Sequence, residues 1–448
     1  MFAFAGRKVW WSAIAIFSVP LVGGAVLIAF FNPRLTRYIE SDRFRAELEK
    51  ETAKGLHFPN AHYANVRRTG FLSAASEGFR AESGRKALKS IDAHGINAKF
   101  NPWGMFLRRW QLDDLHIDSG EVGIQTYTPQ PEPSPAKPWF HVFLPDRVYL
   151  KRVWSEPVDV TWRLRGKKGG FFGTRLLITP HDRDFEYQAT GGTMKLPLMP
   201  DLQLRHTHLL ITKKLLTLYH VDLTPPKTGE GIIHGEGMAG TREDKSVDFK
   251  INFEKVPVSD WLPATWQEHV SGAASGKLRW TGKSPKAENS SVQGTFQLRS
   301  GRVANLPLLE NLVVVTKRKS IERLELRDCS CDIDWNYSTT EIKHIAIEDV
   351  GKLRVEGSIA VHEKSLSGVI RLGVAREYLE WLPHAEEVFT REAGGYLWTT
   401  VHLSGTIDNP QQDLSPRVVE VLKESPSAFL GLVFRQLGEW FKNQFASE

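Results

Sequence analysis

The stretch Ser246-Val-Asp-Phe-Lys-Ile-Asn-Phe-Glu254 decides the fold of this chain. Its residues alternate strictly between an apolar set, Val247, Phe249, Ile251 and Phe253, and a polar set, Asp248, Lys250, Asn252 and Glu254. Successive side chains of a strand point to opposite faces, so this period predicts a β-strand with one apolar and one polar face. The same alternation recurs at Val160-Thr-Trp-Arg-Leu164 and in Val292–Leu298, where Phe296 and Leu298 share the apolar side.

Turn residues separate the predicted strands on both sides of this stretch. Glycine pairs at Gly191-Gly192 and Gly394-Gly395 mark two of the turns that recur about every ten residues. This spacing predicts a mainly β protein built as an antiparallel meander, barrel or sandwich. Helices are expected to be few and short. One begins after Ser41 and runs to about Lys54, where Gly55 stops it, and the stretches Leu308–Thr316 and 376–390 are further short candidates.

Val258-Ser-Asp-Trp-Leu-Pro263 has an echo about 120 residues later in Tyr378-Leu-Glu-Trp-Leu-Pro383. In both places a strand, a glycine and a further proline follow the quoted residues. Such self-similarity indicates a stacked repeat unit.

Composition excludes some classes of function. The chain has 448 residues, with 58 basic residues against 52 acidic ones and a net charge of +6. The charges are interspersed, and no basic stripe with interleaved aromatics predicts a nucleic-acid partner. The two cysteines, Cys329 and Cys331, are one residue apart, which is too close for a zinc knuckle. Positions two apart in a strand share a face, so both thiols can pack on the same side. The cysteines therefore do not indicate whether the protein lies in an oxidising or a reducing compartment.

An apolar stretch near the N-terminus predicts a membrane anchor. Val9–Phe31 contains no charged residue and spans about 35 Å as a helix, enough for a bilayer core of about 30 Å. A cleaved signal peptide is the alternative, but it needs a shorter apolar region. The long apolar run ends in Phe30-Phe31-Asn32-Pro33, a poor cleavage site, which favours an uncleaved anchor. A short tail before a long body favours a body outside the cytoplasm. The anchor residues are Trp10, Trp11, Ile14, Ile16, Leu21, Val26, Leu27, Ile28 and Phe30.

These observations predict five regions. Residues 1–35 are the anchor, 36–128 a helix followed by β structure, 129–138 a proline-rich loop, 139–424 the repetitive β body and 425–448 an amphipathic helix. The last prediction rests on an apolar stripe at helical spacing. Its members are Phe429, Val433, Leu437, Trp440 and Phe441. This stripe has three possible roles: it packs in the core, it contacts a membrane surface, or it caps a groove.

Motifs that suggest chemistry are incomplete. Gly235-Glu-Gly-Met-Ala-Gly240 matches a dinucleotide fingerprint but leads into a strand, whereas the fingerprint requires a helix. His206 and His208 share a strand face, yet no third metal ligand lies at a short fixed spacing. No nucleophile with its base is evident. We therefore expect no enzyme activity, no cofactor and no metal.

The order of several motifs resembles the AsmA family of bacterial envelope proteins. The matching stretches are Phe44–Phe58 leading into Gly70-Phe-Leu, Gly95-Ile-Asn-Ala, Asn101-Pro-Trp, Trp110–Ile117, Gly294–Leu309 and Leu403–Pro410. The likeness extends over most of the chain, and each motif is degenerate.

The resemblance implies a long antiparallel sheet curled into an elongated apolar groove. Such a protein is anchored in the inner membrane, has its body in the periplasm, carries phospholipid or another acyl lipid and supports outer-membrane biogenesis. Outer-membrane or envelope proteins are further partners. We expect the groove lining to include Val247, Phe249, Ile251, Phe253, Phe296 and Leu298.

Two other classes remain as alternatives. A non-catalytic β-scaffold that organises envelope assembly needs one apolar face as well, and an anchored hydrolase needs a catalytic constellation. Exposure of the apolar face distinguishes a carrier from a scaffold.

Overall fold

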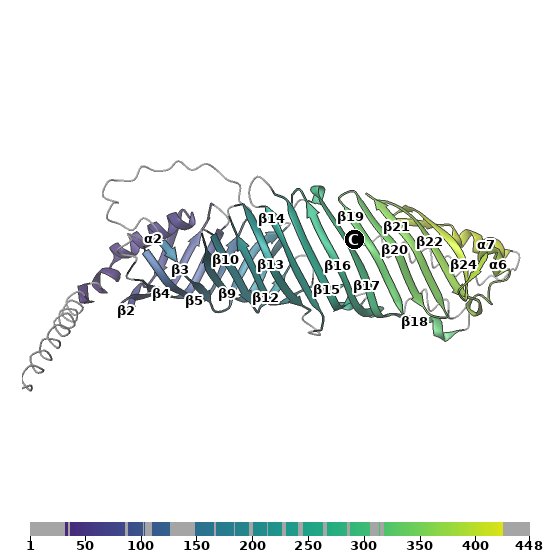
Figure 1. Cartoon of the computed structure of the whole chain (residues 1–448), viewed down its shortest axis with the longest axis horizontal. Coiled ribbons are helices and arrows are strands. Elements are labelled where there is room, and N and C mark those ends of the chain that lie inside the picture. The colour runs from purple at the N-terminus through teal and green to yellow at the C-terminus, as the bar shows by residue number, and fades with distance from the viewer. Residues whose placement is uncertain are drawn as a thin grey trace, which may run out of the picture. The chain divides into compact units, whose positions relative to one another are not determined.

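The chain folds mainly into β-strands (Figure 1). The computed structural model describes residues 32–34, 36–85, 88–101, 103, 110–125, 148–164, 167–182, 184–196, 200–212, 214–225, 230–240, 245–262, 267–284, 287–304, 313 and 318–423. The chain divides into two compact units. Unit 1 comprises Met1–Asp182 and Gly192–Pro197, and unit 2 comprises Arg183–Gly191 and Leu198–Glu448. The proline-rich residues 129–138 thus fall within the sequence of unit 1.

Unit 1 begins with helical residues 32–34 and 36–39 and helix α2 (Asp42–Leu56). Its strands are β1 (Asn60–Ala64), β2 (Arg67–Gly70), β3 (Ser73–Glu82), β4 (Leu88–Phe100), β5 (Trp110–Ile124), β6 (Val148–Leu150), β7 (Val153–Ser155), β8 (Val158–Leu164), β9 (Lys167–His181) and β11 (Thr193–Lys195). Its core contains the buried side chains of Phe58, Phe79, Ala81, Ala93 and Ile96.

Helix α2 begins where the sequence predicted and ends later. The Ser41 hydroxyl accepts a hydrogen bond of 3.2 Å from the backbone N–H of Phe44, which caps the helix. The predicted stop at Gly55 is wrong, because the helix continues to Leu56 and His57 takes the left-handed conformation, with φ of 61°. The next residue, Phe58, donates its N–H to the carbonyl of Ala53 over 2.8 Å and is buried. Burial of Phe58 therefore sets the end of the helix.

The sheet of unit 1 contains both strand orientations. Strands β1 and β2 pair with β3, and β3, β4 and β5 follow in antiparallel order. Strands β6, β7 and β8 then pair with β5 in parallel. Parallel neighbours need a long crossover connection, which the segment between Ile124 and Val148 provides. A purely antiparallel meander, as predicted, is therefore wrong for this unit.

Unit 2 is antiparallel in every described pairing, as the sequence predicted. Its strands are β10 (Asp184–Thr190), β12 (Leu202–Ile211), β13 (Leu215–Thr224), β14 (Ile232–Gly240), β15 (Val247–Pro257), β16 (Val270–Gly282), β17 (Ser290–Ala304), β18 (Arg323–Leu326), β19 (Asp328–Asn336), β20 (Thr339–Asp349), β21 (Leu353–His362), β22 (Ser365–Ala375), β23 (Arg391–Ala393), β24 (Tyr396–Thr406) and β25 (Asn409–Gln412).

Short helices interrupt these strands. They are the 3-10 segments η2 (Val258–Trp261), η3 (Ala287–Asn289), η4 (Lys319–Ile321) and η5 (Arg376–Tyr378), and the helices α6 (Ala385–Val388) and α7 (Leu414–Lys423). The predicted helical region within residues 376–390 is confirmed by η5 and α6.

Both predicted apolar helices fall on residues that the structure does not describe. The anchor Val9–Phe31 lies before residue 32, and the C-terminal stripe from Phe429 to Phe441 lies after residue 423. Among the described helices, none combines the length and apolarity needed to cross a membrane.

Candidate functional site

The strand register of unit 2 aligns apolar side chains across neighbouring strands. Phe249 of β15 lies opposite Trp280 of β16, and Trp280 lies opposite Val292 of β17. Residues directly opposite one another share a face of the sheet. The apolar face of unit 2 is defined here as Ile233, Val247, Phe249, Ile251, Phe253, Leu278, Trp280, Val292, Phe296, Leu298, Ile333, Trp335, Ile342, Ile359, Val361 and Ile370.

Most of this apolar face remains accessible. Phe249, Ile251, Phe253 and Phe296 are only half-buried, although each is large and apolar. Val247 and Leu298 are different, with 5% of each residue exposed. The six residues predicted to line a groove therefore share one face, and four of them present accessible surface.

Neighbouring strands are the main packing partners in the middle of unit 2. In the described residues, strands β15 and β17 make extensive contacts with adjacent strands, and β16 also contacts η2. All the strands of unit 2 that the structure describes belong to one sheet, so no separate second sheet is present among them to cover these three strands. A sandwich would have covered the apolar face with another sheet at about 10 Å.

Two phenylalanine rings converge over a glycine of this face. Phe253 and Phe296 come from strands on either side of β16, yet their ring centroids are 6.3 Å apart. Strands separated by one other strand lie about 9.6 Å apart, so the rings lean toward each other. A Cβ at Gly276 would stand 2.6 Å from Cζ of Phe253. Gly276 thus leaves the space into which the two rings fold.

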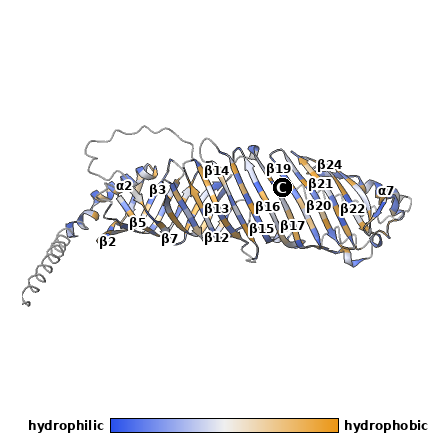
Figure 2. Cartoon of the chain, viewed as in Figure 1, coloured by the Kyte–Doolittle hydropathy of each residue, from blue (hydrophilic) through white to orange (hydrophobic). Residues whose placement is uncertain are grey.

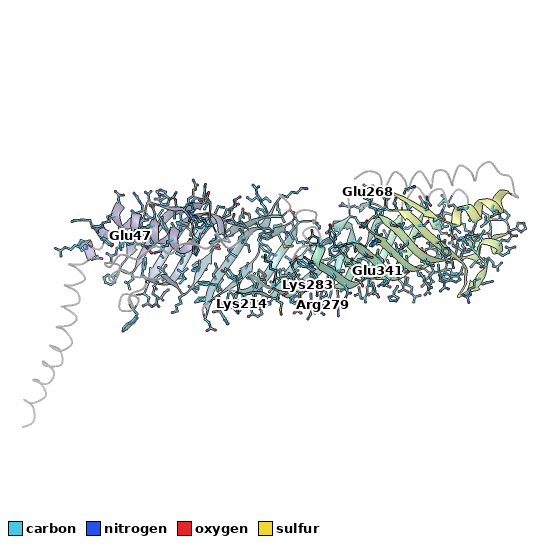
Figure 3. The ribbon with its side chains drawn as sticks, turned by 90° about the horizontal axis from the view of Figure 1, so that it is seen from above. Glu47, Lys214, Glu268, Arg279, Lys283 and Glu341 are labelled. Atoms are coloured by element: carbon cyan, nitrogen blue, oxygen red, sulfur yellow. The ribbon has the colours of Figure 1, made fainter. Side chains whose placement is uncertain are left out.

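Charged and polar residues alternate with the apolar ones along the same strands, as the blue and orange segments of Figure 2 show, and so lie on the opposite face. Arg279 pairs with both carboxylate oxygens of Asp248, at 3.0 and 2.8 Å. This pairing holds the pKa of the Asp248 carboxyl below its ordinary value. Lys250 contacts Glu236 at 3.2 Å, and Lys343 contacts Glu341 at 2.5 Å. Arg279 and Glu341 are labelled in Figure 3. The sheet is therefore amphipathic from β14 to β20.

The apolar side is covered at the C-terminal end of unit 2. Residues 376–389 and α7 form a C-terminal cap over β22 and β24. Its buried members Leu382 and Phe389 pack in one cluster with Leu397 of β24. The accessible surface described above therefore lies on the strands that precede the cap.

A hollow of about 630 Å³ lies on β15, β16, β17 and β19. Its lining combines charged groups, among them Glu254, Lys277 and Asp332, with Phe253 and Phe296 of the apolar face. Residues of both faces of the sheet therefore contribute to this hollow.

Histidines from three strands meet on the polar side of β12, β13 and β14. His206 Nδ1 lies 2.5 Å from His220 Nε2, and His234 Nδ1 lies 2.7 Å from Asp222. His208 is 2.9 Å from Glu186. Sequence reasoning paired His206 with His208 and judged His220 and Asp222 too weak to complete a metal site, and it did not place His234 with them, because strand pairing brings these residues together. Within the described residues, no cluster of three ligating side chains could hold a metal ion.

The histidine cluster predicts a pH dependence of local stability. Burial, followed by the neighbouring His206, lowers the pKa of His220 below its ordinary value of 6.5, while Asp222 opposes this shift. His208 and His234 lower it further. The unfolded chain therefore binds the proton more readily than the folded chain, so stability is present above pH 6.5 and falls as the pH drops below it.

We expect amide protection in β12 and β13 to be weaker at about pH 5.5 than at about pH 7.5, after correction for intrinsic exchange. Hydrogen exchange of the full chain measures this difference. His220→Gln should reduce it, whereas His344→Gln, which removes an exposed histidine of β20, should leave it unchanged. Equal pH sensitivity in His220→Gln and the parent chain would contradict the assignment.

Other sequence motifs occupy ordinary structural positions. Gly235–Gly240 lies within β14, and β15 is the next element. Cys329 and Cys331 are free thiols of β19, and burial raises the pKa of each. Neither arrangement presents a phosphate cradle or an activated thiolate.

Sequence reasoning missed several members of the apolar face. Leu278 and Trp280 alternate with Lys277 and Arg279, so the period-two signal was present but short. Ile333 belongs to the same face through its register with Gly294.

No family model matches the chain, and neither the curated proteins nor the solved structures include a significant match.

Proposed function

We propose that this protein is a non-catalytic lipid carrier of the bacterial cell envelope. In this proposal residues 9–31 anchor the chain in the inner membrane, and the body lies in the periplasm. The apolar face of unit 2 carries acyl chains of phospholipid or a similar lipid and supports outer-membrane biogenesis. The half-buried state of Phe249, Ile251, Phe253 and Phe296 is the observation that carries the proposal.

The energetics of lipid transfer require such a surface. The transfer of one methylene group from an apolar environment into water costs about 0.8 kcal/mol of free energy. An acyl chain of about 16 carbons therefore faces a barrier on the order of 12 kcal/mol. An apolar face removes much of this barrier while the lipid headgroup stays hydrated. No catalytic residue is needed for this process.

The proposal further holds that the sheet curls so that its apolar face lines an elongated groove. The rings of Phe253 and Phe296 lean together over Gly276, which supports a sheet that curls toward its apolar side. The resemblance in motif order to the AsmA family supports the same arrangement. Aligned strands continue the apolar face from β14 to β22. Acyl chains would then slide across the strands.

A β-scaffold without lipid is the second candidate. The C-terminal cap favours it, because Leu382 and Phe389 cover the apolar side of β22 and β24 there. A scaffold needs this kind of covered face along its entire length.

Photo-crosslinking tests the proposal. A photoreactive residue at position 249 should capture phospholipid in cells, because Phe249 lies on the apolar face. The matched control is position 250, where Lys250 is exposed on the polar face beside Glu236. Lipid adducts identified by mass spectrometry at 249 and not at 250 are the expected result. Equal yields at both positions, or none at 249, would contradict lipid carriage.

A further inference from the structure

Exposed aromatic side chains lie at the start of unit 1. Tyr38 is 49% exposed, Phe71 53% and Trp103 68%. Tyr38 precedes α2, Phe71 lies in the turn between β2 and β3, and Trp103 follows β4. Single exposed aromatics are common on proteins, so their positions relative to one another decide whether they form a surface.

The turns that carry Phe71 and Trp103 are neighbours. The backbone N–H of Phe100, at the end of β4, donates to the carbonyl of Leu72 over 2.8 Å. The backbone N–H of Trp103 donates to the side-chain oxygen of Asn101 over 2.9 Å. Both turns therefore lie at the same end of the sheet of unit 1.

Arg68 of β2 joins this end of the sheet to the entering chain. Its guanidinium donates to the carbonyl of Asn32 over 3.0 Å and to the Thr36 hydroxyl over 2.9 Å. The same group donates to the carbonyl of Phe71 over 3.1 Å. Figure 1 shows β2 beside the helical segment that leads into α2. One side chain thus holds the Phe71 turn next to Asn32, the first residue after the apolar stretch Val9–Phe31.

The chain next to the Phe71 turn carries a positive net charge. Residues 32–45 together with Arg67 and Arg68 contain six arginines and two carboxylates. Arg34, Arg37 and Arg67 are exposed. Basic side chains close to a bilayer attract anionic headgroups, and aromatic rings favour the boundary between headgroups and acyl chains.

We propose that this end of unit 1 rests on the surface of the phospholipid bilayer from which the chain emerges. The membrane-contacting surface consists of Tyr38, Phe71, Trp103, Arg34, Arg37 and Arg67. The inference rests on the proposed function in one respect, because it requires residues 9–31 to be anchored. The clamp at Arg68 then fixes the aromatic turns at the level where the anchor ends.

Photo-crosslinking of the full chain in vesicles of phosphatidylethanolamine and phosphatidylglycerol tests this surface. A photoreactive residue at position 71 or 103 should capture phospholipid several-fold more than one at position 337. Tyr337 is a suitable control, since it is 64% exposed in the turn between β19 and β20 of unit 2. In detergent with lipid equimolar to protein, the adducts at 71 and 103 should disappear. Equal capture at all three positions in vesicles would overturn the inference.

The clamp provides a second test with a matched control. Arg68→Gln removes the hydrogen bonds to Asn32, Thr36 and Phe71 and should lower capture at position 71 several-fold. Arg80→Gln removes the same charge from β3, where Arg80 forms an exposed ion pair with Asp92 of β4, and should leave capture unchanged. An equal loss in both variants would contradict the role of Arg68.

The outcomes separate the two proposals. If the protein stays in the membrane fraction but positions 71 and 103 capture no lipid, the membrane-contacting surface is wrong and the anchor stands. If the parent chain leaves the membrane fraction on washing, the proposed anchor fails and this inference fails with it. Loss of capture at position 249 alone would contradict only the lipid-carrying function of unit 2.

Discussion

Phe249→Asp is expected to leave the protein folded and to lower its capture of lipid strongly. Phe249 is half-buried and stacks on Trp280 with centroids 5.6 Å apart, so a carboxylate at this position keeps contact with water. The cost in stability should stay within about 1–3 kcal/mol, the ordinary range for a point substitution. Losing the apolar contact of one ring removes about 1.5–3 kcal/mol of binding, which is roughly a ten- to hundredfold fall in affinity.

A photoreactive residue at position 296 measures lipid capture in this variant, and circular dichroism measures its fold. Thr295→Asp is the matched control, because it places the same carboxylate on the polar face of β17, beside Phe296. The control should capture lipid as the parent chain does. Unfolding by Phe249→Asp would indicate a closed core and favour the scaffold.

Phe389→Ala is expected to produce the largest loss of stability among single truncations in the C-terminal cap. Phe389 is 5% exposed and packs in the cluster that contains Leu379, Leu382 and Leu397. Removal of a buried phenylalanine ring leaves a cavity and costs about 3–5 kcal/mol. Urea unfolding, with hydrogen exchange in β24 as the local probe, measures this cost.

The matched variant is Phe249→Ala, which removes the same ring from the accessible face. Its cost should stay below about 2 kcal/mol, because the half-buried ring loses less transfer free energy. Comparable costs at positions 249 and 389 would mean that the apolar face is covered in solution. The pair therefore tests openness without any lipid.

Local patterns in the sequence predicted the strands but not all of their partners. The alternation from Val247 to Phe253 predicted both the strand and its two faces, because β15 has an apolar and a polar side. The parallel pairing of β5 with β8 was not predicted, since strand direction depends on a long connection and leaves no local pattern. The end of α2 was missed for a related reason: burial of Phe58 is a tertiary effect.

The candidate site shows the same limit. Alternation placed Val247 and Phe249 on one side, yet it cannot distinguish the buried residue from the half-buried one. That difference depends on neighbours such as Gly282 and Trp280, which strand pairing brings opposite them. Likewise, His220 and His234 join His206 only through the register of β12, β13 and β14.

Pairing between successive antiparallel strands makes the length of unit 2 adjustable in steps of one hairpin. Removing two consecutive strands, such as β20 and β21, would make β19 and β22 neighbours, and these two strands run antiparallel. Removing β20 alone would instead make β19 and β21 neighbours, and these run in the same direction. Each hairpin contributes about 9.6 Å across the strands. Variants shortened by whole hairpins should therefore keep both faces and still capture lipid at position 249, which photo-crosslinking would measure. The reach of such a carrier would then be set by the number of its hairpins, independently of the chemistry of its surface.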